Sequence, residues 1–167
     1  AAVWARENTR EAIYDAIKRR EVYATTGSRI KVRFFAGWDF AENDLHRPAM
    51  FDIAYGSGVP MGGDLYDAQE GESPTFLAIA AMDADGAKLD RIQIIKGWME
   101  KNGKLREKVY DVAWSGERIL EEMTGNLPAV GNTVDVAKAT YLNTIGESQL
   151  KAFWQDPDFD RAERAFY

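Results

Sequence analysis

The fold is decided by residues 89–114, which read LDRIQIIKGWMEKNGKLREKVYDVAW. Isoleucine and tryptophan in the first half of this stretch, and valine, tyrosine and tryptophan in the second, are typical of β-strands. Between the halves lies Asn102-Gly103, the strongest short-range signal for a tight hairpin, because type I′ turns need positive φ at both central residues. We therefore expect two antiparallel strands, residues 89–99 and 108–114.

Several segments outside this hairpin also have strand character. Residues 30–34 alternate apolar and basic side chains, which is the period-two pattern of a half-buried strand. Residues 75–82 form an apolar run between turn residues and are predicted to be a strand buried on both faces. Shorter strands are expected at residues 52–56, 133–142 and 165–167.

Helical patterns are restricted to a few places. Asn8 and Thr9 are good N-cap residues, and an apolar stripe with helical spacing follows them to about Arg20. A short helix is expected at residues 150–154 and a helical turn near 118–123. The expected fold class is mainly β (α+β): an antiparallel β-sandwich-like body with one N-terminal helix and a short helix near the C-terminus.

The charge balance and composition exclude several classes of protein. The chain has 21 Lys and Arg against 27 Asp and Glu, a net charge of −6. Binding to a phosphate backbone needs clustered positive charge, so we expect no nucleic-acid partner. The absence of cysteine excludes disulfides and thiolate metal sites. No apolar run approaches the roughly 20 residues of a membrane-spanning helix, so we expect a soluble chain with no transmembrane segment.

Both ends of the sequence have an unusual character. The chain begins within an apolar stretch, Ala1-Ala2-Val3-Trp4, and ends on Ala165-Phe166-Tyr167, which is typical of the middle of a strand. We expect the chain to be part of a longer protein. An edge strand at residues 165–167 could pair with a neighbouring chain and allow self-association.

The residues that most often carry catalysis or metal binding are sparse. His46, the one histidine, could act as a general base paired with Asp44, or it could be a solvated loop residue. Asp83, Asp85 and Asp90 could bind calcium in a loose arrangement, or they could form a plain turn, because the spacing does not fit an EF-hand loop. We expect no metal site within this chain.

Five tryptophans leave a binding function open. On a β-sandwich, exposed indole rings can stack on sugars, whereas buried ones serve the core. The sequence does not separate these roles, so a stand-alone module that binds carbohydrate or another ligand remains an alternative. The residues concerned are Trp4, Trp38, Trp98, Trp114 and Trp154.

A further segment concentrates hydrogen-bond donors. Residues 19–29, RREVYATTGSR, join the end of the predicted helix to a predicted strand and gather Arg, Tyr and Thr around a glycine turn. Such donors could face an anionic ligand. The alternative is an ordinary capped exit from the helix.

The same segment belongs to a wider resemblance. Residues 7–13 (ENTREAI) and 19–27 (RREVYATTG) resemble the end of the metallohydrolase domain of PHP-type proteins, the polymerase and histidinol phosphatase superfamily. The motifs GVPMGGDL, LDRIQIIKGW, YDVA and WQDPDFD resemble a bacterial domain-of-unknown-function family of PHP-like proteins. The resemblance extends over essentially the whole chain.

This resemblance implies a division of the chain and a role for each part. Residues 1–28 would be the end of a PHP-like catalytic domain, and residues 29–167 a β-rich C-terminal domain. A catalytic domain upstream in the same polypeptide would hold divalent metals and activate a hydrolytic water. This chain would hold no cofactor, would be accessory or structural, and would be inactive alone. The parent would be a bacterial metal-dependent hydrolase, such as a phosphoesterase, and a periplasmic or secreted location is compatible with it.

The resemblance also implies which residues lie nearest the chemistry. They would orient or neutralise an anionic substrate and would not bind metal. The residues are Arg20, Tyr23, Thr25 and Arg29.

Overall fold

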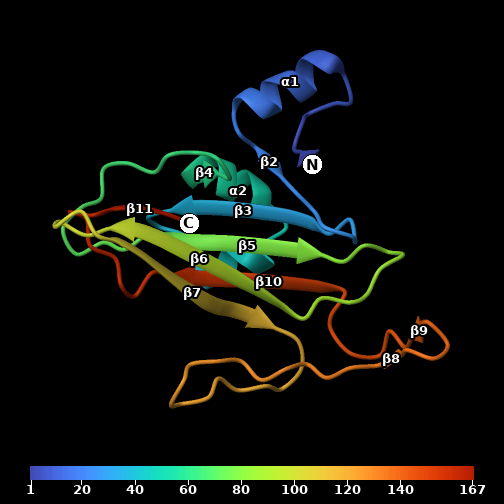
Figure 1. The fold of residues 1–167 in the computed structure, drawn as a ribbon. Coiled ribbons are helices and arrows are strands. Elements are labelled where there is room, and N and C mark those ends of the chain that lie inside the picture. Colours follow the sequence, from blue (N-terminus) through green and yellow to red (C-terminus); the bar gives the residue numbers. More distant parts are fainter.

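A computed structural model describes residues 1–167, and its two larger sheets, both antiparallel, pack face to face (Figure 1). The mainly β fold class predicted from the sequence is confirmed, with two α-helices and one 3₁₀ helix beside the strands. In chain order the elements are β1 (Ala2–Val3), α1 (Arg10–Lys18), β2 (Val22–Tyr23), β3 (Lys31–Gly37), η1 (Glu42–His46), α2 (Met50–Ser57), β4 (Gly58–Pro60), β5 (Thr75–Ala81), β6 (Arg91–Met99), β7 (Leu105–Trp114), β8 (Val134–Asp135), β9 (Thr140–Tyr141), β10 (Gln149–Gln155) and β11 (Arg164–Phe166).

The predicted hairpin forms the first sheet. Strands β6 and β7 pair antiparallel from Met99 opposite Leu105 onward, around a turn in which Gly103 has a φ of 83°. A left-handed φ of this kind is readily adopted by glycine, which has no Cβ. Strand β11 adds to the other side of β6, so the strand order is β11-β6-β7. The prediction of a strand at residues 165–167 is thereby confirmed for Ala165 and Phe166.

The second sheet has the strand order β10-β5-β3-β4, and β5 is its buried centre. Because side chains alternate along a strand, Leu77 and Ile79 face one side and Phe76 and Ala78 face the other. The first side is covered by η1 and α2, and the second packs against the β6–β7 hairpin (Figure 1). The core on the helical side contains Phe35, Phe40, Leu45, Met50, Ala54, Leu77 and Ile79.

Helix α1 begins and ends close to the predicted places. Thr9 is the N-cap residue, and its hydroxyl accepts a hydrogen bond from the Ala12 amide at 3.3 Å. The helix lies to one side of the two sheets, above the small β1–β2 pair (Figure 1). Neither α1 nor any other helix has the length and apolar character required to cross a membrane.

Two short segments were assigned to the wrong type of element. The strand expected at residues 52–56 is part of helix α2, in which Met50 and Ala54, one helical turn apart, are both buried. The short helix expected at 150–154 is strand β10, in which Leu150 and Ala152 point inward at strand spacing. Both are short apolar runs, and periodicity alone does not separate helix from strand at such lengths.

The long connection between β7 and β10 also differs from the prediction. No helical turn forms at residues 118–123, where the structure has an irregular path and a turn at 122–124. The strand expected at 133–142 consists of two two-residue strands, β8 and β9, which pair with each other. Neither is paired to the main sheets, so there is no ladder to extend them.

A buried ion pair lies between the sheets at one end of the sandwich. Lys96 Nζ is 2.6 Å from Asp156 Oδ2, and the two side chains are 3% and 0% exposed. Lys96 Nζ also donates to the Asp158 carbonyl at 2.7 Å, and the Tyr167 hydroxyl donates to Asp156 Oδ2 at 2.5 Å. Burial and the bond to Asp156 both raise the pKa of Tyr167, so the phenol keeps its proton. The cluster therefore joins β6, the segment after β10 and the C-terminal strand.

Replacing Lys96 by Met should be strongly destabilising, because it leaves the Asp156 carboxylate buried without its cation. We expect the free energy of unfolding in urea to fall by about 3–5 kcal/mol. Lys108→Met is the matched control, because Lys108 pairs with Asp158 at the surface, and it should cost less than about 1 kcal/mol. The double variant Lys96→Met, Asp156→Leu should recover most of the loss; equal costs for the two single variants would contradict this role.

Candidate functional site

The segment from the end of α1 to the middle of β3 carries the strongest local positive charge in the chain. Residues 18–33 contain one acid, Glu21, although the whole chain has a net charge of −6. The middle of the segment is an exposed turn, Thr25-Thr26-Gly27, in which Gly27 has a φ of 78°. We call residues 18–33 the basic segment. Its six cations are Lys18, Arg19, Arg20, Arg29, Lys31 and Arg33.

One of these cations is fixed in an internal network. The Arg33 Nη1 donates to the Tyr55 hydroxyl at 2.6 Å and lies 3.6 Å from Glu21 Oε1. Its guanidinium carbon is 3.6 Å from the centre of the Trp4 ring, a cation–π distance. Glu21 is only 3% exposed and also pairs with Arg19 at 3.4 Å. Arg33 and Glu21 therefore attach the N-terminal elements to β3 and α2.

Tyr55 completes this network as a neutral donor. Its hydroxyl donates to Glu21 Oε1 while it accepts from Arg33. Burial, followed by the hydrogen bond to Glu21, raises the pKa of Tyr55. The phenol therefore keeps the proton that it donates to Glu21.

The four residues predicted to lie nearest the chemistry are distributed along the basic segment. Arg20 has a φ of 64° and pairs with Asp64 at 2.7 Å on the surface. The Tyr23 ring stacks on Trp4, with ring centres 6.0 Å apart. Thr25 is exposed. Arg29 is also exposed, and only its backbone amide is engaged, donating to an Asp83 carboxylate oxygen at 2.7 Å.

The structure thus separates the four residues into two kinds. Arg20 and Tyr23 make contacts within the chain, whereas Thr25 and Arg29 are exposed and their side chains make no hydrogen bond or ion pair. No hydrogen bond joins any two of the four side chains. Their roles toward a substrate remain predictions.

The carboxylates and the histidine considered for metal binding or catalysis are not brought together. Asp83 accepts the backbone amides of Arg29 and Asp85, and these two hydrogen bonds lower the pKa of its carboxyl. His46 is exposed at the end of η1, and its expected partner Asp44 instead pairs with Arg47 at 3.4 Å. No group of three or more His, Asp or Glu side chains in the chain is arranged to hold a metal ion.

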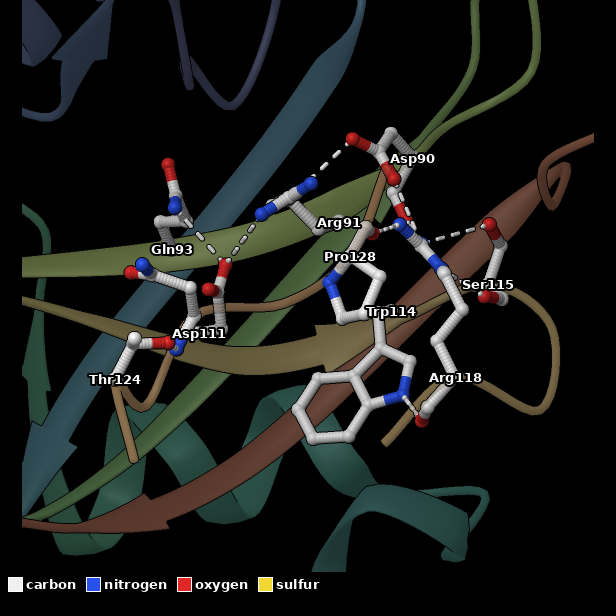
Figure 2. A network of polar contacts seen from close by, with 10 residues as sticks. Asp90, Arg91, Gln93, Asp111, Trp114, Ser115, Arg118, Thr124 and Pro128 are labelled. Atoms are coloured by element: carbon white, nitrogen blue, oxygen red, sulfur yellow. Dashed lines mark hydrogen bonds and ion pairs between the residues drawn. The ribbon is translucent and has the colours of Figure 1, made fainter. Parts of the chain in front are cut away.

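Asp90 belongs to a different network, at the other end of the hairpin (Figure 2). Arg118 Nη2 lies 2.6 Å from Asp90 Oδ1 and donates to the Asp90 carbonyl at 2.9 Å. The remaining Arg118 donors bind the carbonyls of Ser115 and Pro128, at 3.0 and 2.8 Å. Asp90 also pairs with Arg91 at 3.0 Å. All of these groups serve to fix the chain that follows β7.

Comparison with known families decides the classification of the chain. Residues 1–167 match the family model described as protein of unknown function (DUF3604). The chain is a member of the DUF3604 family. The predicted resemblance to a domain-of-unknown-function family over the whole chain is thereby confirmed, while the relationship to PHP proteins stays a prediction. No curated protein and no solved structure matches the chain.

Sequence reasoning missed the internal networks of this DUF3604 chain. Arg33 lies two residues before Phe35 on β3, and Lys96 two residues after Ile94 on β6, so each shares a face with a buried apolar residue. A basic residue on the apolar face of a strand is the signal that could have indicated a buried charge. Glu21 carries no comparable signal.

Tyr55→Phe should weaken the network and change its response to alkaline pH. Losing a hydrogen bond to a charged group should lower the free energy of unfolding at neutral pH by about 1.5–3 kcal/mol. Because the raised pKa of Tyr55 favours the protonated folded state, its contribution is complete below the unfolded pKa of about 10 and is lost as pH rises through the folded pKa.

Urea unfolding at a series of pH values measures both effects. The loss of stability above about pH 10 should be shallower in Tyr55→Phe than in the original chain. Tyr66→Phe is the control, because Tyr66 is exposed and its hydroxyl makes no hydrogen bond, and it should change stability by less than about 0.5 kcal/mol. Identical alkaline slopes for the original chain and Tyr55→Phe would reject the linkage.

Proposed function

We propose that this DUF3604 chain is the β-rich accessory part of a PHP-like metal-dependent hydrolase that acts on phosphoesters. The observation that carries the proposal is the basic segment, in which six cations accompany one acid in a chain of net negative charge. Such a segment attracts anionic substrates and repels cationic ones. The hydrolase assignment itself rests on the sequence resemblance to PHP proteins.

Arg29 is the best candidate for direct contact with the substrate. It is exposed, it lies beside the Thr25-Thr26-Gly27 turn, and its guanidinium has no partner within the chain. A guanidinium can bind two phosphate oxygens at once, which fixes orientation as well as charge. The Thr25 hydroxyl would supply a further hydrogen bond from the same turn.

Arg20 and Tyr23 would assist substrate binding less directly than Arg29. The Arg20–Asp64 pair is more than half exposed on both sides, and such pairs contribute little stability, so Arg20 could exchange Asp64 for a substrate anion. Tyr23 would support the segment by its stacking on Trp4. Neither role requires a metal ligand in this chain, and the divalent metal is proposed for the upstream domain.

The upstream catalytic domain is the proposed partner within the same polypeptide. Helix α1 presents Tyr14 and Ile17 to solvent, and both are more than half exposed. An apolar helix face of this kind is suited to packing against another domain. The basic segment begins at the end of α1, so a domain bound there would lie next to the exposed cations.

The alternative of a carbohydrate-binding module gains no specific support. It depends on exposed indole rings, but all five tryptophans are at least partly buried. Three of them donate their indole N–H to main-chain carbonyls, which fixes the rings in place. These are Trp4, Trp38 and Trp114.

Arg29→Ala tests the proposal in the intact protein, with its upstream region present and loaded with Mn²⁺. We expect kcat/KM for p-nitrophenyl phosphate or bis(p-nitrophenyl) phosphate to fall about tenfold, because a charged contact to the substrate is lost. Lys138→Ala is the control, because Lys138 is a surface cation far along the chain that pairs only with Asp135.

Two results would contradict the proposal in different ways. Equal kcat/KM values for Arg29→Ala and Lys138→Ala would remove Arg29 from the substrate site. Absence of hydrolysis of both esters by the unaltered intact protein would reject the phosphoesterase assignment itself.

A further inference from the structure

The connection between β7 and β10 is an exposed acidic strap. We define the strap as residues 116–148; it runs outside the two sheets and contains only the small β8–β9 pair (Figure 1). It holds five acidic and two basic residues. Its apolar side chains are largely in solvent, with Met123 98% and Val136 86% exposed. The other exposed large apolar residues of the strap are Ile119, Val134, Tyr141 and Leu142.

The strap is nevertheless attached to the body at defined points. Arg118 binds the Ser115 and Pro128 carbonyls (Figure 2). Leu127, in the same part of the strap, is buried. Near the other end, the Asn143 side chain bonds to the backbone of Gly86 and Lys88. The exposed apolar residues therefore lie on a segment that hydrogen bonds attach to the body of the protein near both of its ends.

The outer face of the β6–β7 sheet carries a second apolar surface. Ile95 lies directly opposite Val109, and Met99 directly opposite Leu105. Phe166 of β11 covers Gly97, where a Cβ would lie 2.3 Å from its ring. We call this surface the outer patch, and all of its residues except Gly97 are at least 44% exposed. It consists of Ile95, Gly97, Met99, Leu105, Val109 and Phe166.

The charge around the outer patch is opposite to that of the strap. Lys96 is buried against Asp156 and does not contribute to the surface charge, so residues 91–114 present five basic and three acidic residues. Lys101 and Lys104 lie in the turn beside Met99 and Leu105, and Glu107 lies opposite Gly97. Two outer patches would therefore repel each other, and so would two straps, whereas a strap and an outer patch attract. The two surfaces are matched in both apolar character and charge.

We propose that the strap of one copy docks on the outer patch of a second copy of this chain. The strap leaves β7 at the end opposite the hairpin turn (Figure 1). A two-fold axis that sets the two hairpins antiparallel brings each strap to the other copy's turn, and both contacts form at once. This contact uses the face of the sheet, unlike the pairing of the edge at residues 165–167 expected from the sequence.

Reciprocal charge reversal tests this contact. The patch variant is Lys101→Glu, Lys104→Glu, and the strap variant is Glu117→Lys, Glu122→Lys; all four side chains are exposed. In sedimentation equilibrium, the unaltered chain should form dimers. Each variant alone should have a dimer dissociation constant at least about tenfold higher, because both of its contacts join like charges.

An equimolar mixture of the two variants should form a heterodimer of normal affinity. In it one contact joins two unaltered surfaces and the other joins two reversed surfaces, so both are attractive again. The control variant is Arg6→Glu, Arg10→Glu. It changes the net charge by the same amount as the patch variant, but near α1, and it should dimerise normally.

Three results would overturn the proposal. A monomeric unaltered chain at every accessible concentration would show that the occupant is not a second copy. Unchanged dimerisation of either variant would place the contact elsewhere. A mixture that stays as weak as its components would show that strap and patch do not meet.

Discussion

The architecture depends on how the buried pair Lys96–Asp156 is satisfied. Removing two charges from water is costly, and their attraction compensates only when the geometry is good and the remaining polar atoms are bonded. Here Lys96 also binds the Asp158 carbonyl, and Asp156 also accepts from the Asp158 amide and from Tyr167. These bonds connect β6 of one sheet with the segment after β10 of the other, so they constrain how the two sheets pack.

The aromatic residues around this pair extend the same constraint. Tyr167 packs against Phe76 with ring centres 4.5 Å apart, and Trp154 contacts Tyr110 at 4.7 Å. Phe76 and Trp154 belong to one sheet and Tyr110 to the other, so the rings fill the space between them. With that face occupied and the opposite face covered by α2 and η1, the surfaces left for binding lie outside the space between the sheets: the exposed face of α1, the basic segment, the outer patch and the strap.

The sequence predicts the elements whose signals are local. The β6–β7 hairpin, buried β5 and α1 follow from a turn pair, an apolar run and a cap, all within a few residues. Strand β10 and helix α2 were misassigned because their type depends on what covers them. The internal charges were missed for a related reason: Lys96 and Asp156 are 60 positions apart, and Tyr55 and Glu21 are 34 apart. The exposed residues of the candidate site, Thr25 and Arg29, needed no long-range partner and could be selected from the sequence.

The distribution of charge separates two kinds of binding surface. Concentrating like charges costs repulsion, which an even distribution of the same residues would avoid. In the hairpin, the exposed cations flank apolar side chains such as Met99 and Leu105, a combination suited to a large protein surface with an acidic rim. In the basic segment, Arg29 flanks hydroxyls and a glycine turn, with no apolar patch to cover, which is suited to a small anion. The two positive surfaces of the chain therefore favour different partners, and each can be altered without the other.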